Sequence, residues 1–477
     1  MKHYGKFYID GEWVDAIGKQ RFELIDPSTE TPFASISLGS AEDVDRAVAA
    51  AAAAFPAFSE TGKAERVALL KRIIAAFTER ENEVLATISQ EMGAPLTLRG
   101  QTGAALEALQ QAVVTLEDYA FETRQGRNII CREAIGVCGL ITPWNWPLQL
   151  LCIKLGSALA AGCTMVIKPS EFTPLSTMLM VEIMHAAGVP KGVVNLVQGD
   201  GPTVGNAITR HREVAMVSFT GSTRAGILVA EAAAGTVKRV AQELGGKSAN
   251  IVLPDADQDA AARWNVARAM SNSGQSCHSP SRVLVHESRL AQVLDAMRDA
   301  AAQVRVGAPS DPATTMGPVV NRAQFEKIRG YIQSGLDQGA QLVRGGLDRP
   351  EGLEAGYYIS PTIFAGVTPA MNIASEEIFG PVISVITYRD VAEAIAIAND
   401  TDYGLGGYVF AGSIDAGMAV GRKLRAGRIF YNGAPADPSA PMGGYKMSGN
   451  GREMGTYGLE EYLEVKAMLG FTSPAAA

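Results

Sequence analysis

Short apolar runs rich in β-branched residues alternate with helical patterns through the first half of the chain. The runs include TMVIKP, VVNLVQG, VAMVSFTGS and SANIVLP, and stretches such as LSTMLMVEIMHAAG and TRAGILVAEAAAG lie between them. Uninterrupted apolar strands that alternate with helices are typical of a parallel sheet covered by helices on both faces. The pattern therefore predicts an α/β fold.

A second set of such elements follows the glycine pair Gly245 and Gly246. It opens with the apolar run SRVLVHES and the stretch RLAQVLDAMRDAAAQV. This repetition predicts a chain with two lobes and a hinge near ELGGKS. Near the N-terminus, Ser40 followed by Asp43 is a helix-capping signal, so the alanine-rich run after it is expected to be a helix rather than a linker.

The segment from Leu148 to Ile167 has about the 20 residues that a membrane span requires. Against a span stand Lys154 near its middle, the glycines Gly156 and Gly162, and a β-rich end. We expect a core helix followed by a core strand.

Composition and net charge mainly exclude classes of protein. A chain of 477 residues with 47% hydrophobic residues has room for roughly three domains or lobes. Its net charge of −8 argues against nucleic-acid binding, and its five cysteines lack the spacing of a disulfide framework or a metal site. The N-terminal MKHYGKFYIDGEWVD lacks the apolar core of a signal peptide, so we expect a cytoplasmic protein without a membrane partner.

Two glycine-rich loops follow predicted strands and precede predicted helices. They are GDGPTVG and TGSTRAG, and Ser222 or Thr223 could cap the helix after the second loop. Backbone amides at such a position can bind a pyrophosphate, although ordinary tight turns use the same residues. Neither loop has the GxGxxG pattern, so together they indicate a nucleotide and no more.

Three polar residues stand in apolar or glycine-rich surroundings: Asn145 in TPWNWP, Glu243 in AQELGGKS and Cys277 in GQSCHSPS. A thiol nucleophile, a carboxylate base and an amide donor suffice for acyl chemistry through a thioester. Each residue also has a structural interpretation, as a turn asparagine, a salt-bridged charge or a loop thiol. A Cys277–His278 dyad is not expected, because adjacent side chains rarely face each other.

Seven ordered motifs make the chain similar to the aldehyde dehydrogenase superfamily from about Ile9 to about Lys466. They are TPWNWP, KPSE, FTGST, ELGGKS, GQSC, EEIFGPV and MGGYKMSGNGREMG. The resemblance implies two Rossmann-like parallel-sheet domains and a small β oligomerisation element. It places the NAD-binding domain at 1–118 and 136–245 and the catalytic domain at 246–445. The oligomerisation element and C-terminal strand would be 119–135 and 446–477, with the strand itself at Leu459 to Met468.

The same resemblance implies the NAD-dependent oxidation of an aldehyde to the carboxylate. Cys277 would be the nucleophile, Asn145 and the Cys277 amide would hold the oxyanion, and Glu243 would activate water. Implied cofactor-binding residues are Thr142, Trp144, Lys168, Ser170, Glu171, Gly201, Pro202, Gly221, Ser222, Gly245, Glu377 and Phe379. Implied walls of the substrate pocket are Trp146, Leu150, Ile153, Ser276 and His278.

Several alternatives remain at this level. Glu171 favours NAD over NADP, and Glu243 favours hydrolysis over transfer to coenzyme A. A semialdehyde dehydrogenase of narrow range, a non-redox thiol hydrolase and a non-enzymatic protein on the same scaffold are further interpretations. Relatives often have Phe where Met442 stands in PMGG. The resemblance implies a homo-oligomer, with a tetramer favoured over a dimer, and does not identify the aldehyde.

Overall fold

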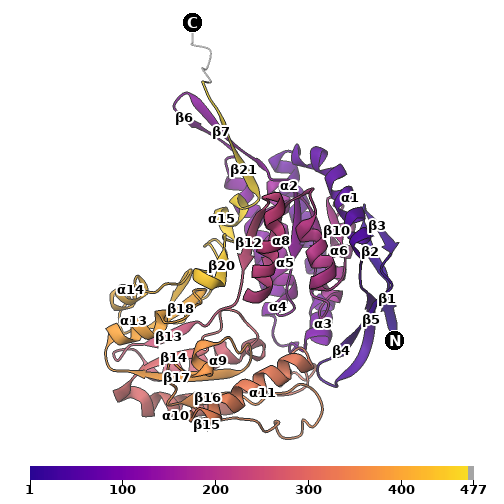
Figure 1. Ribbon diagram of the computed structural model, residues 1–477. Coiled ribbons are helices and arrows are strands. Elements are labelled where there is room, and N and C mark those ends of the chain that lie inside the picture. Colours follow the sequence, from indigo (N-terminus) through magenta and orange to yellow (C-terminus); the bar gives the residue numbers. More distant parts are fainter. Residues whose placement is uncertain (471–477) are drawn as a thin grey trace.

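Two large sheets lie beside each other, and a narrow arm of strands projects from one end of the molecule (Figure 1). The computed structural model describes residues 1–470. The chain passes from the first large sheet to the second between Glu243 and Ala249, within ELGGKS. The predicted α/β class is confirmed.

The first sheet has eight strands in the order β20-β12-β11-β8-β9-β10-β2-β3. Its five inner strands are parallel, and the strands at both edges join antiparallel. The strands are β2 (Lys6–Ile9), β3 (Glu12–Asp15), β8 (Val137–Ile141), β9 (Thr164–Lys168), β10 (Val194–Leu196), β11 (Val214–Thr220), β12 (Arg239–Glu243) and β20 (Gly449–Asn450). Because neighbouring parallel strands end at the same edge, the loops after β8, β9, β11 and β12 converge there.

Helices cover both faces of this sheet, which explains why its central strands β8, β9 and β10 are buried along their whole length. In β8, Val137 and Ile141 pack on one face, whereas Cys138 and Leu140 pack on the other. The first face is covered by α1 (Ala41–Ser59), α7 (Asn206–Arg210) and α8 (Thr223–Ala233). The second face is covered by α2 (Lys63–Glu79), α3 (Glu81–Met92), α4 (Gly100–Asp118), α5 (Pro147–Ala161) and α6 (Leu175–Ala186).

The second sheet has seven strands in the order β15-β16-β17-β14-β13-β18-β19. Only β15 is antiparallel to its neighbour. The strands are β13 (Ala249–Val252), β14 (Arg282–His286), β15 (Gln341–Arg344), β16 (Thr362–Ala365), β17 (Val382–Tyr388), β18 (Gly406–Phe410) and β19 (Arg428–Tyr431). The helices on its two faces are α9 (Gln258–Met270) with α10 (Leu290–Ala302), and α11 (Arg322–Asp337) with α13 (Val391–Asn399) and α14 (Ile414–Gly421).

The projecting arm is a three-stranded antiparallel sheet in the order β21-β7-β6. Its strands are β6 (Glu122–Gln125), β7 (Asn128–Ala134) and β21 (Leu463–Met468). The C-terminal strand begins at Leu463 and not at Leu459, because Gly455–Glu460 forms the short helix α15. The last residues of the expected segment 446–477 lie outside the described residues. Another small sheet joins β1 (Lys2–Tyr4), β5 (Thr31–Ser37) and β4 (Arg21–Asp26).

Two local predictions are confirmed. The helix α1 begins with a capping box, in which the Ser40 hydroxyl accepts from the Asp43 amide and the Asp43 carboxylate accepts from the Ser40 amide. The segment Leu148–Ile167 divides into α5 and β9. No helix within residues 1–470 is both long and apolar enough to cross a membrane.

Candidate active site

The thiol of Cys277 lies where two cavities meet. The wide cavity has a volume of about 330 Å³, and Cys277 and Glu243 are both in its wall. The narrow cavity has a volume of about 140 Å³, and Cys277 and Asn145 are both in its wall. The fold therefore brings together three residues that are between 34 and 132 positions apart in the sequence. A molecule in either cavity can approach the same sulfur atom.

Unusual backbone geometry precedes the thiol. Asn272 and Ser273 have φ of 54° and 56°, and Gly274 follows with φ of 72°. A Cβ atom at Gly274 would lie 2.1 Å from the Gly380 carbonyl oxygen, so only glycine fits there. This turn carries the chain away from the end of α9 and into the junction of the two cavities. Cys277 is partly exposed, whereas the other four cysteines are buried.

Cys277 is held in a surrounding that disfavours its thiolate. Burial, together with the carboxylates of Glu377 and Glu243, raises the pKa of the Cys277 thiol to about 12. The backbone amides of Cys277 and His278 act in the opposite direction. A nucleophilic thiolate at neutral pH therefore needs further stabilisation from its neighbours.

Asn145 is tied to the loop that carries the thiol. The side-chain amide of Asn145 donates to the Gln275 carbonyl oxygen at 3.0 Å. The backbone carbonyl oxygen of Asn145 accepts from the side-chain amides of Gln101 and Asn272. The side chain is buried, with 3% of its surface exposed. These bonds fix Asn145 relative to Cys277 and leave a second amide hydrogen of Asn145 for a ligand.

Glu243 ends β12 and is buried without a hydrogen-bond partner for Oε1. Burial and the Glu453 carboxylate raise the pKa of Glu243 well above its ordinary value, although Lys154 opposes the shift. A carboxyl group with a raised pKa and a free oxygen in a cavity wall is suited to proton transfer.

A buried ion pair that the sequence did not reveal lies behind Glu243. The Lys154 ammonium contacts Glu453 Oε1 and donates to the Ser218 hydroxyl at 2.9 Å. Lys154 is the residue that argued against a membrane span, and the structure pairs it with a carboxylate 299 positions away. Only a long-range contact of this kind explains a lysine inside an apolar helix.

The wall of the narrow cavity is formed by residues at the ends of several strands and by the distant loop that contains Glu377 and Phe379. Trp144 meets Phe379 edge to face at 5.3 Å, and Glu377 accepts from the Gly246 amide at 2.9 Å. A Cβ atom at Gly245 would lie 2.6 Å from Glu377 Oε2, so the glycine leaves room for that carboxylate. Two predicted cofactor-binding residues complete this part of the wall, Gly221 and the α8 cap Ser222.

Several residues of this wall were not predicted, among them Gln324 and Lys327 of α11. Gln324 Oε1 is buried without a partner, and so is the Thr220 hydroxyl at the end of β11. Such atoms suit a bound molecule that carries several hydroxyl and phosphate groups. The donor set of the narrow cavity therefore fits a dinucleotide.

Four more of the predicted cofactor-binding residues gather at the neighbouring strand end. Lys168 at the end of β9 lies 3.7 Å from the Glu171 carboxylate, and burial lowers the pKa of Lys168 despite Glu171 and Asp200. The Thr142 amide donates to the Lys168 carbonyl oxygen, and the Thr142 hydroxyl is buried without a partner. The Ser170 hydroxyl accepts from the Phe172 amide.

The loop GDGPTVG reaches the same strand end. Gly201 and Pro202 are exposed at the start of the short helix η1 (Gly201–Gly205). At the end of that helix, a Cβ atom on Gly205 would contact Lys168 Cδ at 3.7 Å. The structure therefore brings one of the two glycine loops beside Lys168 and the other into the narrow cavity.

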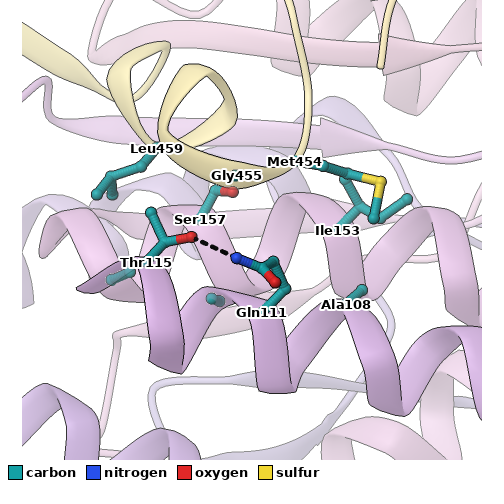
Figure 2. A pocket seen from close by; sticks show the side chains of 10 residues that line it. Ala108, Gln111, Thr115, Ile153, Ser157, Met454, Gly455 and Leu459 are labelled. Atoms are coloured by element: carbon teal, nitrogen blue, oxygen red, sulfur yellow. Dashed lines mark hydrogen bonds between the residues drawn. The ribbon is translucent and has the colours of Figure 1, made fainter. Parts of the chain in front are cut away.

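The wide cavity contains three of the five predicted substrate-pocket residues: Trp146, Leu150 and His278. Ser276 accepts a hydrogen bond from the Trp146 indole at 2.8 Å. Ile153 is not in this wall. It lies about one turn beyond Leu150 on α5 and faces a small hollow between α4, α5 and α15. In Figure 2 the Met454 side chain lies beside Ile153 in that hollow. The hollow has a volume of only about 10 Å³, so it is too small for a substrate.

The sequence did not reveal the part of the wide cavity's wall that the second sheet and its helix α9 supply. This wall includes Trp264 and Arg268 of α9, Tyr408 of β18, and Arg428 and Phe430 of β19. No motif marks these residues, because they come from separate elements of the second sheet. The wall is aromatic and carries two guanidinium groups.

His278 also departs from expectation. Its Nδ1 lies 3.9 Å from Cys277 Sγ, although side chains of adjacent residues were not expected to face each other. The two residues occupy a tight turn, in which the Ser279 amide donates to the Ser276 carbonyl oxygen. In such a turn neighbouring side chains can point to the same side, unlike in a strand.

Comparisons with a family model and with known proteins all point to one enzyme family. The family model described as the aldehyde dehydrogenase family matches residues 13–468. A 3-succinoylsemialdehyde-pyridine dehydrogenase of a Pseudomonas species is 51% identical over 99% of this chain and 99% of that protein. A putative aldehyde dehydrogenase of Staphylococcus aureus is 45% identical over 99% of this chain and 100% of its own length.

Solved structures agree closely with this fold. A mutant of aldehyde dehydrogenase C from Pseudomonas syringae, in complex with NAD⁺ and octanal, is 48% identical with a TM-score of 0.97, and the match covers 99% of this chain and 98% of that one. Mycobacterium tuberculosis aldehyde dehydrogenase in complex with NAD⁺ is 37% identical with a TM-score of 0.95, and the match covers 98% of each chain.

Proposed function

Because the chain belongs to the aldehyde dehydrogenase family, we propose that it oxidises an aldehyde to the carboxylate with NAD, through a covalent thioester on Cys277. One observation carries the proposal: Cys277 lies at the meeting of two cavities. The wide cavity would admit the aldehyde, and the narrow cavity would hold the nicotinamide end of NAD. Similar proteins have been solved with NAD⁺, which supports this choice of cofactor.

The first step is attack of the Cys277 thiolate on the aldehyde carbon, which gives a thiohemiacetal. The oxygen of the former carbonyl then carries negative charge. Asn145 and the Cys277 backbone amide are placed to donate to that oxygen, and one such donor is typically worth about 2.7–4 kcal/mol in the transition state. The hydrogen bond from Asn145 to the Gln275 carbonyl oxygen holds this donor in position before the substrate binds.

Bound NAD supplies the acceptor for the hydride that leaves the thiohemiacetal carbon. Trp144, Phe379 and Glu377 would hold the cofactor against the thiol. Glu243 then takes a proton from the water molecule that attacks the thioester, which releases the carboxylate and restores the thiol. A buried carboxylate in the wall of the wide cavity supports hydrolysis, since transfer to coenzyme A requires no such base.

The test is the stoichiometry of the reaction. With aldehyde and NAD, we expect equal amounts of NADH, followed at 340 nm, and of carboxylic acid. A non-redox thiol hydrolase would act on thioesters without any nucleotide and would form no NADH. Release of acid only after coenzyme A is added would favour acyl transfer over hydrolysis.

For the substrate class, we propose an aldehyde that carries an aromatic ring, of the semialdehyde kind. Trp264, Tyr408 and Phe430 give the wide cavity an aromatic wall, and aromatic rings pack well against such surfaces. The similar Pseudomonas enzyme is named for a semialdehyde joined to a pyridine. A panel of aryl semialdehydes and linear aldehydes such as octanal, compared by kcat/KM, decides between this class and simple aliphatic aldehydes.

Cofactor choice gives the first prediction. Glu171→Gln is expected to raise the kcat/KM ratio of NADP over NAD by about tenfold, because a carboxylate accepts from ribose hydroxyls but repels a 2′-phosphate. Lys168 at 3.7 Å from this carboxylate partly offsets the repulsion in the native protein. Glu182→Gln, on the surface of α6 away from both cavities, is the matched control and should leave the ratio unchanged. An unchanged ratio in Glu171→Gln would remove the ribose assignment.

Assembly gives the second prediction. We propose a homo-oligomer, with a tetramer favoured over a dimer, in which the arm of β6, β7 and β21 pairs with a second copy. Five of the six residues of β21 are exposed, and 67% of the Val465 surface and 41% of the Met468 surface are accessible in the single chain. An open strand edge of this kind is normally covered. Light scattering at micromolar concentration should give a multiple of the chain mass, and a monomer would contradict the proposal.

A further inference from the structure

Arg268 reaches His278 across the wall of the wide cavity. A terminal nitrogen of the Arg268 guanidinium contacts Nε2 of His278. Within residues 1–470, no carboxylate forms an ion pair with Arg268, although that side chain is only partly exposed. The guanidinium has two uncharged neighbours, the His278 ring and the Tyr408 side chain. Arg268 is not used in the mechanism described above.

The contact determines which nitrogen of His278 carries a proton. Every hydrogen on a guanidinium is a donor, and arginine stays charged in proteins. A nitrogen that faces Arg268 at bonding distance must therefore be the acceptor. A neutral imidazole has one N–H, so that hydrogen lies on Nδ1. Nδ1 is the nitrogen that faces Cys277 Sγ at 3.9 Å.

The charged groups around His278 keep the ring neutral. Burial, with Arg268 from α9 and Arg428 from β19, lowers the pKa of His278 to about 3. On β18, the Tyr408 hydroxyl donates to the His278 carbonyl oxygen at 2.7 Å and so holds the backbone of this residue. The carboxylates nearest the thiol are Glu243 of β12 and Glu377, and both act on the sulfur.

We propose that Arg268 fixes His278 as the Nδ1–H tautomer, and that this N–H donates to the Cys277 sulfur and stabilises its thiolate. The proposal rests on the role of Cys277 as the nucleophile. His278 then touches the reacting atom, and Arg268 is a positioning residue that acts through it. His278 does not serve as a base, because one nitrogen already carries a proton and the other is occupied by arginine.

This hydrogen bond would offset the unfavourable surroundings of the Cys277 thiolate. Burial and two carboxylates disfavour the thiolate of Cys277. A hydrogen bond to a charged acceptor favours the charged form and lowers the pKa of that acceptor. The N–H of His278 opposes the carboxylates without adding a charge, so the wide cavity keeps a neutral group next to an uncharged aldehyde.

The experiment measures the rate of iodoacetamide alkylation of Cys277 between pH 6 and pH 10 in the full-length protein without aldehyde. The other cysteines are buried, and Cys277→Ala gives the background rate. His278→Ala should raise the apparent pKa of the thiol by about one unit, which lowers alkylation at pH 7.5 about tenfold. His278→Asn places an amide N–H near the position of Nδ1 and should stay within about threefold of the native rate.

A double-mutant cycle tests the part of Arg268. Arg268→Met lets the proton move to Nε2, so we expect the apparent thiol pKa to rise by about half a unit. The same substitution in the His278→Ala protein should cause no further rise, because Arg268 acts through the ring. Equal shifts in both backgrounds would mean that the arginine charge acts on the sulfur directly and would overturn the proposal.

Two other outcomes also overturn it: a His278→Ala profile that equals the native one, or a His278→Asn profile that equals that of His278→Ala. Binding of NAD, followed by protein fluorescence, checks that each variant is folded. Alkylation requires no turnover, so these results are independent of the oxidation assay. Failure of the proposed function would appear instead as the absence of NADH formation by the native protein.

Discussion

Replacing Cys277 with alanine is expected to lower aldehyde oxidation by at least about a thousandfold, because the proposed covalent intermediate forms on its thiol. Among residues 1–470, Cys277 is the one thiol in the wall of the wide cavity. Binding of NAD should change little, since the side chain contributes one atom beyond Cβ to a cavity built by other residues. Steady-state formation of NADH and a separate titration of NAD measure the two effects.

Cys131→Ala is the matched control for this variant. Cys131 lies on β7 in the projecting arm, away from both cavities, so its loss should leave kcat unchanged. A Cys277→Ala protein that keeps more than a few per cent of the native rate would transfer the nucleophile to another residue.

Substitution of Glu243 by glutamine should separate the two halves of the reaction. Thiohemiacetal formation and hydride loss need the thiolate, whereas hydrolysis of the thioester needs a base. We expect a burst of NADH of about one equivalent per active site, followed by a steady state reduced by about a hundredfold or more. Rapid-mixing absorbance at 340 nm resolves the two phases.

The pH dependence of the native enzyme follows from the same group. The pKa of Glu243 is raised by burial and Glu453, so its carboxylate form becomes more abundant as the pH rises through that value. The steady-state rate should therefore increase with pH through a transition that the glutamine variant lacks. A glutamine variant in which burst and steady state fall by the same factor would assign Glu243 to activation of the thiol instead.

Much of the fold was predictable because its signals are local. The strands of the first sheet are buried on both faces, so an uninterrupted apolar run such as TMVIKP indicates a parallel strand without further information. The Ser40 and Asp43 capping box marks the start of α1 in the same way. The start of β21 was placed four residues too early, because Gly455–Glu460 continues as a helix against α4 and α5.

The candidate site was predictable only where its residues lie in recognisable motifs. Cys277, Glu243 and Asn145 stand in such motifs, and the fold places all three around the same junction. Ile153 was assigned to the substrate pocket together with Trp146 and Leu150, but it lies one turn beyond Leu150 on α5 and lines a different hollow. A helical residue three positions after another shares its face but lies about 4.5 Å further along the axis, so proximity in sequence does not place a residue in a wall.

By itself, the sequence determined most of the elements that form and the candidates for the chemistry, because periodicity, capping and motifs are properties of short stretches of chain. Only the tertiary structure decided what surrounds those residues. The Lys154–Glu453 pair, the aromatic wall with Trp264, and the contact of Arg268 with His278 join positions on different elements. The physical reason is that desolvation and hydrogen bonding act over a few ångströms in space, and the folded backbone alone sets which distant residues come that close.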